Sequence, residues 1–560
     1  MDGKVFVTVE KGMRIEVPEG TTILEVIPQV RDLLEEKYGS TDNVIAARVD
    51  GHLVDLHYKL KKDAKLDFID AHTVTGRRII ERSYVFLLTL AARDVLGNEN
   101  VLVEHSYNQG LYGRLRDREI TYGELEKIKE TMWEYVKKGL KFEYVEMDRK
   151  EAIELFEKEG RDDKVRLFTT LHSKYVTLYK AEGTDYYDYV FLPLVPDTSY
   201  LNAFDLIIYP PGFVLVLPEV KNYRKPAKFE EIVMLYKAFQ EHRNWLTLMG
   251  LQDVGALNKA IVSGKAKDII MVAEALQEKK IAQIADMIAD SIDDVRLVLI
   301  AGPSSSGKTT FSKRLGVQLR VNGIKPIVIS TDDYFVPRDK TPRDEEGRPD
   351  FDSIKAMDIE FFNQQLMALL KGEEIELPRY NFVRGVRERS GKFVRLEKNS
   401  VIVVEGIHAL NPITTAEIPG YTKFKIYVSA LTQLNIDDHN RIPTTDARLI
   451  RRMVRDSLFR GYGVIDTLRQ WPLVRRGEDR YIFPYQEEAD VFFNSALPYE
   501  LSVLRPLVEP LLQAVPKLYP EYAEAERLLK FIRHFEPLST TFVPRTSLLR
   551  EFVGGSLFEY

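Results

Sequence analysis

The sequence predicts an α/β protein of several domains, in which a mostly parallel sheet follows two smaller mixed modules. From about residue 295, short apolar strands alternate with helical segments, the pattern of parallel strands joined by crossover helices. Before that point, groups of short strands stand beside groups of helices, which is the α+β order. The length of 560 residues leaves room for three or four domains at roughly 150 residues each.

The first module is predicted to span residues 1–70. Apolar residues recur at helical spacing between Thr21 and Tyr38. The strand candidates VIAARVDG, HLVDLHYKL and AKLDFIDA follow that helix. Short strands wrapped around one helix indicate a β-grasp fold of the ubiquitin-like type.

An α+β domain is expected over residues 71–225, followed by a helical connector over 226–292. Helices are predicted at Ser83 to Leu96, Tyr122 to Gly139 and Arg149 to Glu159. The strand candidates KYVTLYKA, YYDYVFLPLVP, FDLIIYPP and FVLVLPEV come after them, broken by proline and glycine. The longest helical stretch of the connector runs from Glu274 to Ile292.

The last domain is predicted to span residues 293–560. Its strand candidates are VRLVLIAG, PIVIST, SVIVVEG, KFKIYVSA and ADVFFNSA. Because helical segments lie between them, we expect helices on both faces of a parallel sheet. In such sheets, ligands bind at the carboxyl ends of the strands.

Composition excludes several kinds of chemistry. Hydrophobic residues make up 44% and charged residues 29%, and 79 basic against 85 acidic residues give a net charge of −6. The whole chain is therefore not a basic nucleic-acid coat. The absence of cysteine excludes disulfides, thiolate nucleophiles and cysteine-ligated metals. No apolar run approaches the ~18 residues of a membrane-spanning helix, and no signal peptide is evident, so we expect a soluble cytoplasmic protein without a membrane partner.

A complete phosphate-binding loop follows the first strand of the last domain. The segment GPSSSGKT matches the Walker A pattern, with a strand before it and the helix TFSKRLGVQLR after it. Its glycines let backbone N–H groups converge on phosphate oxygens, and the helix N-terminus adds partial positive charge. Lys308 is expected to reach the β- and γ-phosphates and the Thr309 hydroxyl to bind Mg²⁺. The predicted nucleotide-binding residues are Gly302, Ser304, Ser305, Ser306, Gly307, Lys308, Thr309 and Thr310.

Two acidic positions complete the predicted phosphoryl-transfer chemistry. Asp332 follows the strand PIVIST, where a carboxylate could take the proton from an attacking hydroxyl. Glu405 ends the strand SVIVVE at the Walker B position, where a carboxylate reaches Mg²⁺ directly or through water. A turn or strand-end acid is the alternative interpretation of each.

An arginine-rich segment lies between residues 441 and 480, with ten arginines against five acids. Arg448, Arg451, Arg452 and Arg455 fall within two helical turns. Guanidinium groups bind phosphates bidentately, so a mobile basic lid over ATP is the functional interpretation. A solvated helix face is the alternative.

Together these motifs resemble the uridine kinase and phosphoribulokinase family over about residues 295–515. GPSSSGKTT, STDDYF, DFDSI, PRYNF, VVEGI and DARLIRRMVRDSLFRG occur in the family's order. The resemblance implies a P-loop kinase that uses ATP and Mg²⁺. It implies Asp332 as catalytic base with Lys308, Arg451 and Arg455 in catalysis, Arg452 on the nucleotide, Glu405 on the metal, and a substrate site of Asp352, Tyr380, Arg448 and Gln470.

One departure from the family weakens the assignment of a pyrimidine acceptor. Uridine kinases usually continue past a PxYDF motif to a histidine that binds the pyrimidine. Here the aspartate is replaced by Asn381, and Gly385 stands at the histidine position. Loss of a base-specific hydrogen bond can reduce discrimination by orders of magnitude, so phosphoryl transfer is the firmer expectation.

The N-terminal half is similar to different proteins. Residues 1–70 resemble the TGS module, and residues 71–220 resemble the second accessory domain of threonyl-tRNA synthetase, above all in the passage ITYGELEKIKETMWEYVKKGLKFEYVEMDRKEAIELF. That domain edits with a His-x-x-x-His pair and a later cysteine and histidine. The stretch ERSYVF stands at the equivalent place here, without histidine, so we expect no hydrolytic editing.

Three functions follow from these patterns. The leading hypothesis is an ATP- and Mg²⁺-dependent kinase acting on a small hydroxyl substrate, with a nucleoside such as uridine or cytidine favoured. The second is an RNA-directed phosphotransferase whose N-terminal half holds tRNA. The third is a non-catalytic regulator that binds nucleotide and RNA. Homo-oligomerisation is left open.

Overall fold

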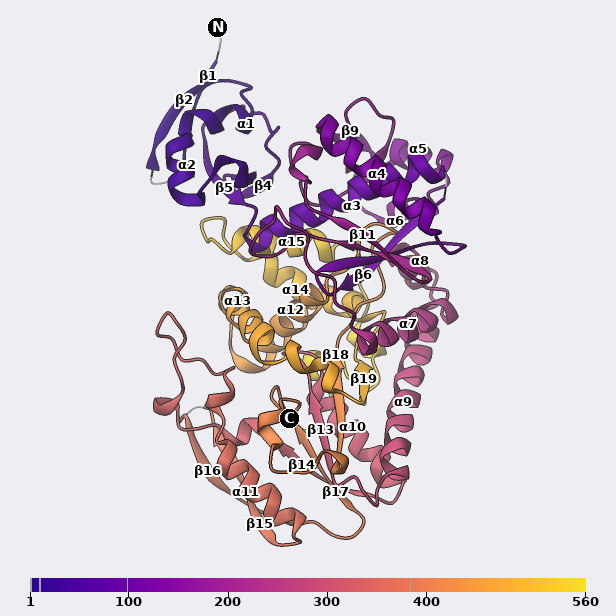
Figure 1. Ribbon diagram of the computed structural model, residues 1–560, viewed down its shortest axis with the longest axis vertical. Coiled ribbons are helices and arrows are strands. Elements are labelled where there is room, and N and C mark those ends of the chain that lie inside the picture. The colour runs from indigo at the N-terminus through magenta and orange to yellow at the C-terminus, as the bar shows by residue number, and fades with distance from the viewer. Residues whose placement is uncertain (1–2, 10–11, 98, 383, 560) are drawn as a thin grey trace.

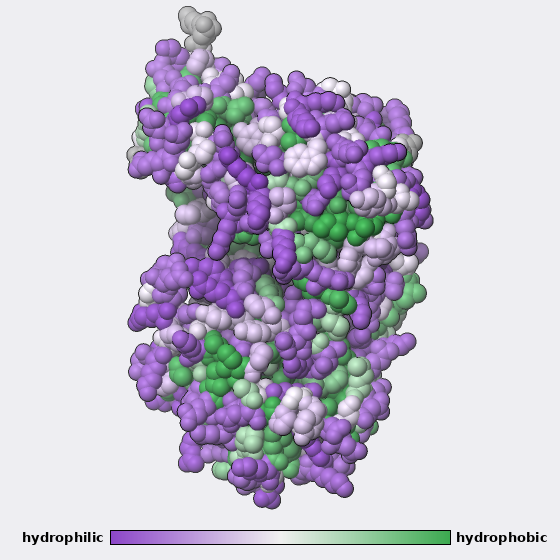
Figure 2. All heavy atoms as spheres, in the orientation of Figure 1, coloured by the Kyte–Doolittle hydropathy of each residue, from purple (hydrophilic) through white to green (hydrophobic). Residues whose placement is uncertain are grey.

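The computed structural model describes residues 3–9, 12–97, 99–382 and 384–559. The N-terminal module and the synthetase-like part lie at one end of the elongated molecule, and the kinase-like sheet lies at the other (Figure 1). Helices from the C-terminal segment fill the space between them. Hydrophilic side chains cover most of the face seen in Figure 2. Within the described part of the chain, no helix combines the length and the apolar character needed to cross a membrane.

The N-terminal module is built on a sheet of strand order β2-β1-β5-β3-β4. Its helical stretch begins at Thr22, whose side chain forms a capping box with Glu25, and it ends at Gly39 in the left-handed conformation. Pro28 lies in a 3₁₀ turn that divides the single predicted helix in two. The elements are β1 (Lys4–Thr8), β2 (Arg14–Pro18), α1 (Ile23–Val26), α2 (Arg31–Tyr38), β3 (Val44–Val49), β4 (His52–Val54) and β5 (Ala64–Asp70).

The synthetase-like part surrounds one long buried helix, α3 (Val74–Leu96). Two antiparallel sheets accompany it, of order β11-β12-β7-β6 and β10-β9-β8. The strands are β6 (Val101–Tyr107), β7 (Gly110–Leu115), β8 (Phe142–Asp148), β9 (Tyr175–Ala181), β10 (Tyr187–Tyr189), β11 (Asp205–Tyr209) and β12 (Gly212–Val216), and the helices are α4 (Tyr122–Lys138), α5 (Arg149–Lys158) and α6 (Asp162–Thr170). Strands β6 and β7 were not predicted from the sequence. The α+β character was predicted correctly.

Three helices, α7 (Val233–Leu248), α8 (Val254–Val262) and α9 (Ala266–Asp290), lead into the kinase-like part over residues 293–560. The last turns of α9 belong to the core of that part, because Ile281, Ile284 and Ile288 are fully buried within it. Glu278 on α9 also forms an ion pair with Arg314 of the helix after the phosphate loop. The end of α9 is therefore an integral helix of the kinase layer.

The kinase part contains a parallel sheet of order β14-β17-β13-β18-β19, and every neighbouring pair of these strands is parallel. Its strands match the predicted segments: β13 (Leu297–Ala301), β14 (Lys325–Ser330), β17 (Ser400–Glu405), β18 (Lys423–Ser429) and β19 (Val491–Asn494). The remaining elements are α10 (Lys308–Val321), α11 (Ile359–Leu370), β15 (Glu374–Asn381), β16 (Val386–Arg395), α12 (Thr444–Arg455), α13 (Val464–Tyr481), α14 (Glu500–Gln513), α15 (Tyr522–Ile532) and α16 (Arg550–Val553). The predicted α/β class is confirmed.

The loop before α12 joins the two halves of the molecule. Lys164 of α6 is fully buried and contacts Asp188 at 2.9 Å and Asp437 at 2.8 Å. Arg441 forms a two-bond ion pair with Glu81 of α3, and Arg82 donates to the carbonyl of Arg441. The segment over residues 435–441 is thus enclosed by the synthetase-like part.

Candidate active site

The phosphate loop has the backbone that an anion site requires. A Cβ at Gly302 would lie 1.9 Å from the carbonyl oxygen of Val428, so only glycine fits there. Ser305 has a φ of 58° and Gly307 a φ of 85°, which turns successive backbone groups toward the start of α10. This loop leads directly into α10, whose N-terminal N–H groups complete the anion site.

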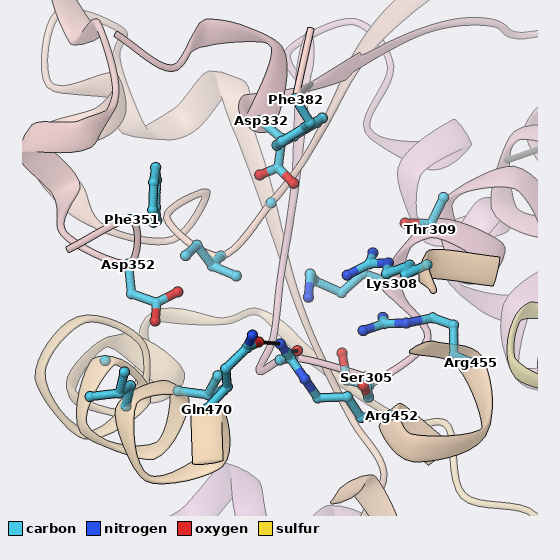
Figure 3. A pocket seen from close by; sticks show the side chains of 18 of the residues that line it. Ser305, Lys308, Thr309, Asp332, Phe351, Asp352, Phe382, Arg452, Arg455 and Gln470 are labelled. Atoms are coloured by element: carbon cyan, nitrogen blue, oxygen red, sulfur yellow. Dashed lines mark hydrogen bonds between the residues drawn. The ribbon is translucent and has the colours of Figure 1, made fainter. Parts of the chain in front are cut away.

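The loop forms the floor of a cavity of about 1280 Å³ at the carboxyl edge of the parallel sheet. Lys308, Thr309 and Arg455 lie on one side in Figure 3, and Asp352 and Phe351 lie on the other. The predicted residues that line it are Ser304, Ser305, Ser306, Gly307, Lys308, Thr309, Asp332, Asp352, Glu405, Arg452, Arg455 and Gln470. The other predicted site residues lie outside the lining that the described chain provides: Gly302, Thr310, Tyr380, Arg448 and Arg451.

Three charged groups cluster at the loop. The Lys308 ammonium donates to the carbonyl of Pro303 at 3.1 Å, and burial lowers its pKa. Asp332 lines the cavity, and desolvation by the surrounding protein raises the pKa of its carboxyl. Burial, reinforced by the charge of Asp332, raises the pKa of Glu405 to about 7. Burial is therefore the main cause of the raised pKa of both carboxyl groups, and it outweighs the positive charge of Lys308.

Glu405 and Thr309 have the chemistry of a Mg²⁺ site. The Thr309 hydroxyl lies 3.5 Å from Oε1 of Glu405. Mg²⁺ commonly takes one or two protein oxygens together with substrate phosphates and water. The raised pKa of Glu405 also indicates a carboxylate whose ionised form a cation would stabilise. These residues fit the expected ion.

The arginines of α12 separate into two groups. Arg452 donates to the Ser304 hydroxyl at 3.0 Å and to Gln470 at 3.3 Å, the dashed contact in Figure 3. Arg455 is paired with Asp456 and lines the cavity beside it. This face of the helix is available to a phosphate.

Arg448 and Arg451 lie behind the loop instead of in the cavity. Both are fully buried. Arg448 donates to the carbonyl of Ser304 and pairs with Glu478, whose carboxylate in turn accepts from the Ser304 N–H at 3.0 Å. Arg451 pairs with Glu500 and donates to the Ser305 carbonyl. Both arginines therefore position the phosphate loop from behind, where the sequence led us to expect contacts with substrate or transferring phosphate.

The opposite side of the cavity contains Asp352. Burial, with the charges of Asp350 and Glu478, raises the pKa of Asp352 to about 7. A Cβ at Gly477 of α13 would lie 2.6 Å from the Cβ of Asp352, so this glycine leaves room for the carboxylate. Phe351 and Phe382 line the cavity nearby.

The segment that departs from the family pattern contains Asn381 and Gly385, and the Gly385 N–H donates to the carbonyl of Asn381 at 2.7 Å. Tyr380 is buried, and its N–H donates to Asp333 at 3.0 Å. Gly385 has a φ of 68°, and a Cβ there would lie 2.8 Å from the Cβ of Arg338. A side chain at this position would require the turn to rearrange. Val383, between them, lies outside the described residues.

Sequence reasoning missed the C-terminal residues of the lining. Arg550, Glu551, Gly554, Gly555, Ser556 and Phe558 contribute to the cavity wall. Glu478 was missed as well, although it lies in the arginine-rich segment. The sequence near the C-terminus contains the pair Gly554-Gly555 shortly before Phe558, but this pattern matches no phosphate-binding motif.

Comparison with known proteins agrees with both halves of the molecule. Residues 297–501 match the model of the Phosphoribulokinase / Uridine kinase family. A uridine kinase of Halobacterium salinarum is 29% identical over 194 residues, which are 34% of this chain and 76% of that protein. The C-terminal part therefore resembles the kinases of this family.

Threonine–tRNA ligases match the N-terminal side. The ligase of Desulforamulus reducens is 29% identical over 204 residues, 36% of this chain and 31% of that protein. The chain thus spans about a third of the length of the ligases it matches.

Among solved structures, a possible uridine kinase from Bacillus stearothermophilus is 22% identical and aligns with a TM-score of 0.25, covering 38% of this chain and 97% of that one.

Proposed function

We propose that this protein is an ATP- and Mg²⁺-dependent kinase that moves the γ-phosphoryl group of ATP to a hydroxyl of a small substrate. The observation that carries the proposal is the meeting of a complete phosphate loop, Asp332 and Glu405 in one cavity at the carboxyl edge of the sheet. Phosphoryl transfer needs positioning and charge stabilisation more than covalent chemistry. This arrangement provides both.

The residues that line the cavity have separate roles in the transfer. Asp332 accepts the proton of the attacking hydroxyl, and burial raises the pKa of its carboxyl, which makes the carboxylate a better proton acceptor. Lys308, Arg452 and Arg455 neutralise the charge on the transferring group. Thr309 and Glu405 would hold Mg²⁺, which would supply positive charge beside the phosphates.

The favoured acceptor is a nucleoside such as uridine or cytidine. Asp352 is available to accept hydrogen bonds from ribose hydroxyls, and Phe351 provides apolar surface beside it (Figure 3). The position that would carry a base-binding histidine is Gly385, so we expect weak discrimination between bases. Broad use of nucleosides, or of another small hydroxyl compound, follows.

The synthetase-like half positions the arginine helix. Its residues Glu81, Arg82 and Lys164 enclose the segment directly before α12, and Arg78 of α3 contacts Asp446 within α12 at 3.1 Å. These contacts fix the orientation of the helix that presents Arg452 and Arg455.

The likeness to threonine–tRNA ligases makes tRNA the competing acceptor.

A screen with labelled ATP tests the proposal. Full-length protein is incubated with Mg²⁺ and, separately, with nucleosides, sugars and tRNA. Transfer to a nucleoside or another small alcohol is the expected result. Transfer to tRNA alone would support an RNA-directed phosphotransferase, and ATP binding without transfer to any acceptor would support a regulator.

A further inference from the structure

The C-terminal segment forms a wall of the nucleotide cavity although it lies beyond residue 501, where the family match ends. Gly554, Gly555, Ser556 and Phe558 line the cavity together with the phosphate loop. This segment, Arg550–Phe558, is called the C-terminal wall below.

The C-terminal wall is held by a fixed base. Leu548, Leu549 and Phe552 are fully buried. The Arg550 guanidinium donates to several backbone carbonyls at once, those of Thr540, Val543, Pro544 and Gly554. The N–H of Leu557 also donates to the carbonyl of Arg545 at 3.0 Å. The wall therefore has a defined shape before any ligand binds.

The C-terminal wall also contacts the phosphate-binding helix. Oε2 of Glu551 accepts from the Thr310 N–H at 3.2 Å and from the Thr310 hydroxyl at 2.7 Å. The N–H groups of a first helical turn have no partner within the helix. Glu551 supplies one, and it places the wall against the start of α10.

The geometry of transfer decides which part of ATP faces this wall. The attacking and leaving oxygens lie on opposite sides of the transferring phosphorus. The acceptor belongs beside Asp332 and Asp352, and Asp352 lies across the cavity from Thr309 in Figure 3. ADP, the leaving group, must then extend past Thr309 along the start of α10, where Glu551 contacts Thr310.

Two aromatic side chains and two glycines shape this end of the cavity. Phe459 is 56% exposed, and Phe558 is partly exposed; both line the cavity. Gly554 has a φ of 80°, and a Cβ there would approach the Phe459 ring to 3.0 Å; Gly555 has a φ of 71°. Aromatic faces stack on nucleobases, and glycine lets backbone approach a ligand closely.

From these contacts we infer that the C-terminal wall binds the nucleoside half of ATP, with Phe558 and Phe459 packing against the adenine base. The inference rests on the proposed kinase function. It adds the C-terminal wall with Phe558, which lies outside the matched range, to Phe459, which lies within it. The phosphate loop then binds the phosphates, and the C-terminal wall binds the base.

The test compares two ligands that share phosphates and differ in the nucleoside. Dissociation constants of Mg²⁺-ATP and of Mg²⁺ with inorganic tripolyphosphate are measured by calorimetry on full-length wild type, Phe558→Ala and a chain ending after Val553. Leu557→Ala is the matched control, because Leu557 is 60% exposed and is not among the described lining residues. Thermal unfolding checks that each variant is folded.

Phe558→Ala should weaken ATP binding by about tenfold, in the range measured for loss of one stacking contact, and leave tripolyphosphate binding within twofold. The truncated chain should lose at least as much, and Leu557→Ala should match wild type with both ligands. Unchanged ATP affinity in Phe558→Ala would overturn the inference, as would equal weakening of both ligands. Wild type that binds neither ligand would contradict the kinase proposal itself.

Discussion

The stability of the free enzyme should depend on pH through Asp352, and Asp352→Asn removes that dependence. The pKa of this carboxyl rises from 3.8 in the unfolded chain to about 7 in the folded protein. Between these values the folded state binds a proton that the unfolded state has released. Stability is therefore full below about pH 4, and it falls as the pH rises through 7.

The expected size follows from that pKa difference. Each pH unit in this window removes about 1.4 kcal/mol of unfolding free energy. Between pH 5 and pH 8.5 the wild type should lose about 3 kcal/mol through Asp352, and an asparagine loses none. For a domain of this size that difference corresponds to roughly 5–10 °C in Tm.

Thermal unfolding of both proteins at pH 5 and at pH 8.5, without nucleotide or Mg²⁺, measures the effect. Other carboxyl groups titrate in both proteins, so the difference between the two Tm values isolates Asp352. Asp352→Asn should gain stability over wild type as the pH rises, while its kcat/KM for the acceptor falls. A Tm difference that is independent of pH, or that favours wild type at pH 8.5, would refute the assigned environment.

Four further variants test the rest of the site. Lys308→Ala should abolish transfer and weaken ATP binding with Tm unchanged, because the loop backbone does not need the side chain; near wild-type turnover would contradict this. Asp332→Asn should lower kcat by about 10²–10⁴-fold with ATP affinity kept, and an equal loss of ATP affinity would argue against its role as base. Gly477→Ala should raise the KM of the acceptor and spare ATP binding, since its Cβ would meet Asp352 at 2.6 Å; an unchanged KM contradicts that contact. Lys164→Met should lower the unfolding free energy by about 3–5 kcal/mol, because it removes the buried ammonium that contacts both Asp188 and Asp437; a Tm equal to wild type would exclude this.

Much of the kinase sheet could be predicted, because its strands are short and mostly apolar, and β13, β17 and β19 are buried along nearly their whole length. The five segments from VRLVLIAG to ADVFFNSA correspond to β13, β14, β17, β18 and β19 of this sheet. The phosphate loop was predictable because its motif is contiguous in the sequence, and Gly307 meets a local backbone requirement with its φ of 85°. Such features can be predicted from residues that are adjacent in the sequence.

Contacts over long sequence distances could not be predicted in this way. The spacing of Arg448, Arg451, Arg452 and Arg455 gave a helix, but it did not decide which face meets the back of the phosphate loop. Glu551 contacts Thr310 across 241 positions of the sequence, and no hydrophobic periodicity predicts such a pair. The left-handed turn at Gly385 likewise depends on Arg338, which is supplied by a separate segment.

The product of the reaction tests the central claim most directly. Full-length wild type and Asp332→Asn are incubated with Mg²⁺-ATP and uridine, cytidine, adenosine or guanosine, and the products are identified by mass spectrometry. The wild type should form a nucleoside monophosphate and ADP in equal amounts, and Asp332→Asn should form almost none in the same time. ATP bound by a folded wild type that phosphorylates none of these nucleosides, nor any other small alcohol, would contradict the account.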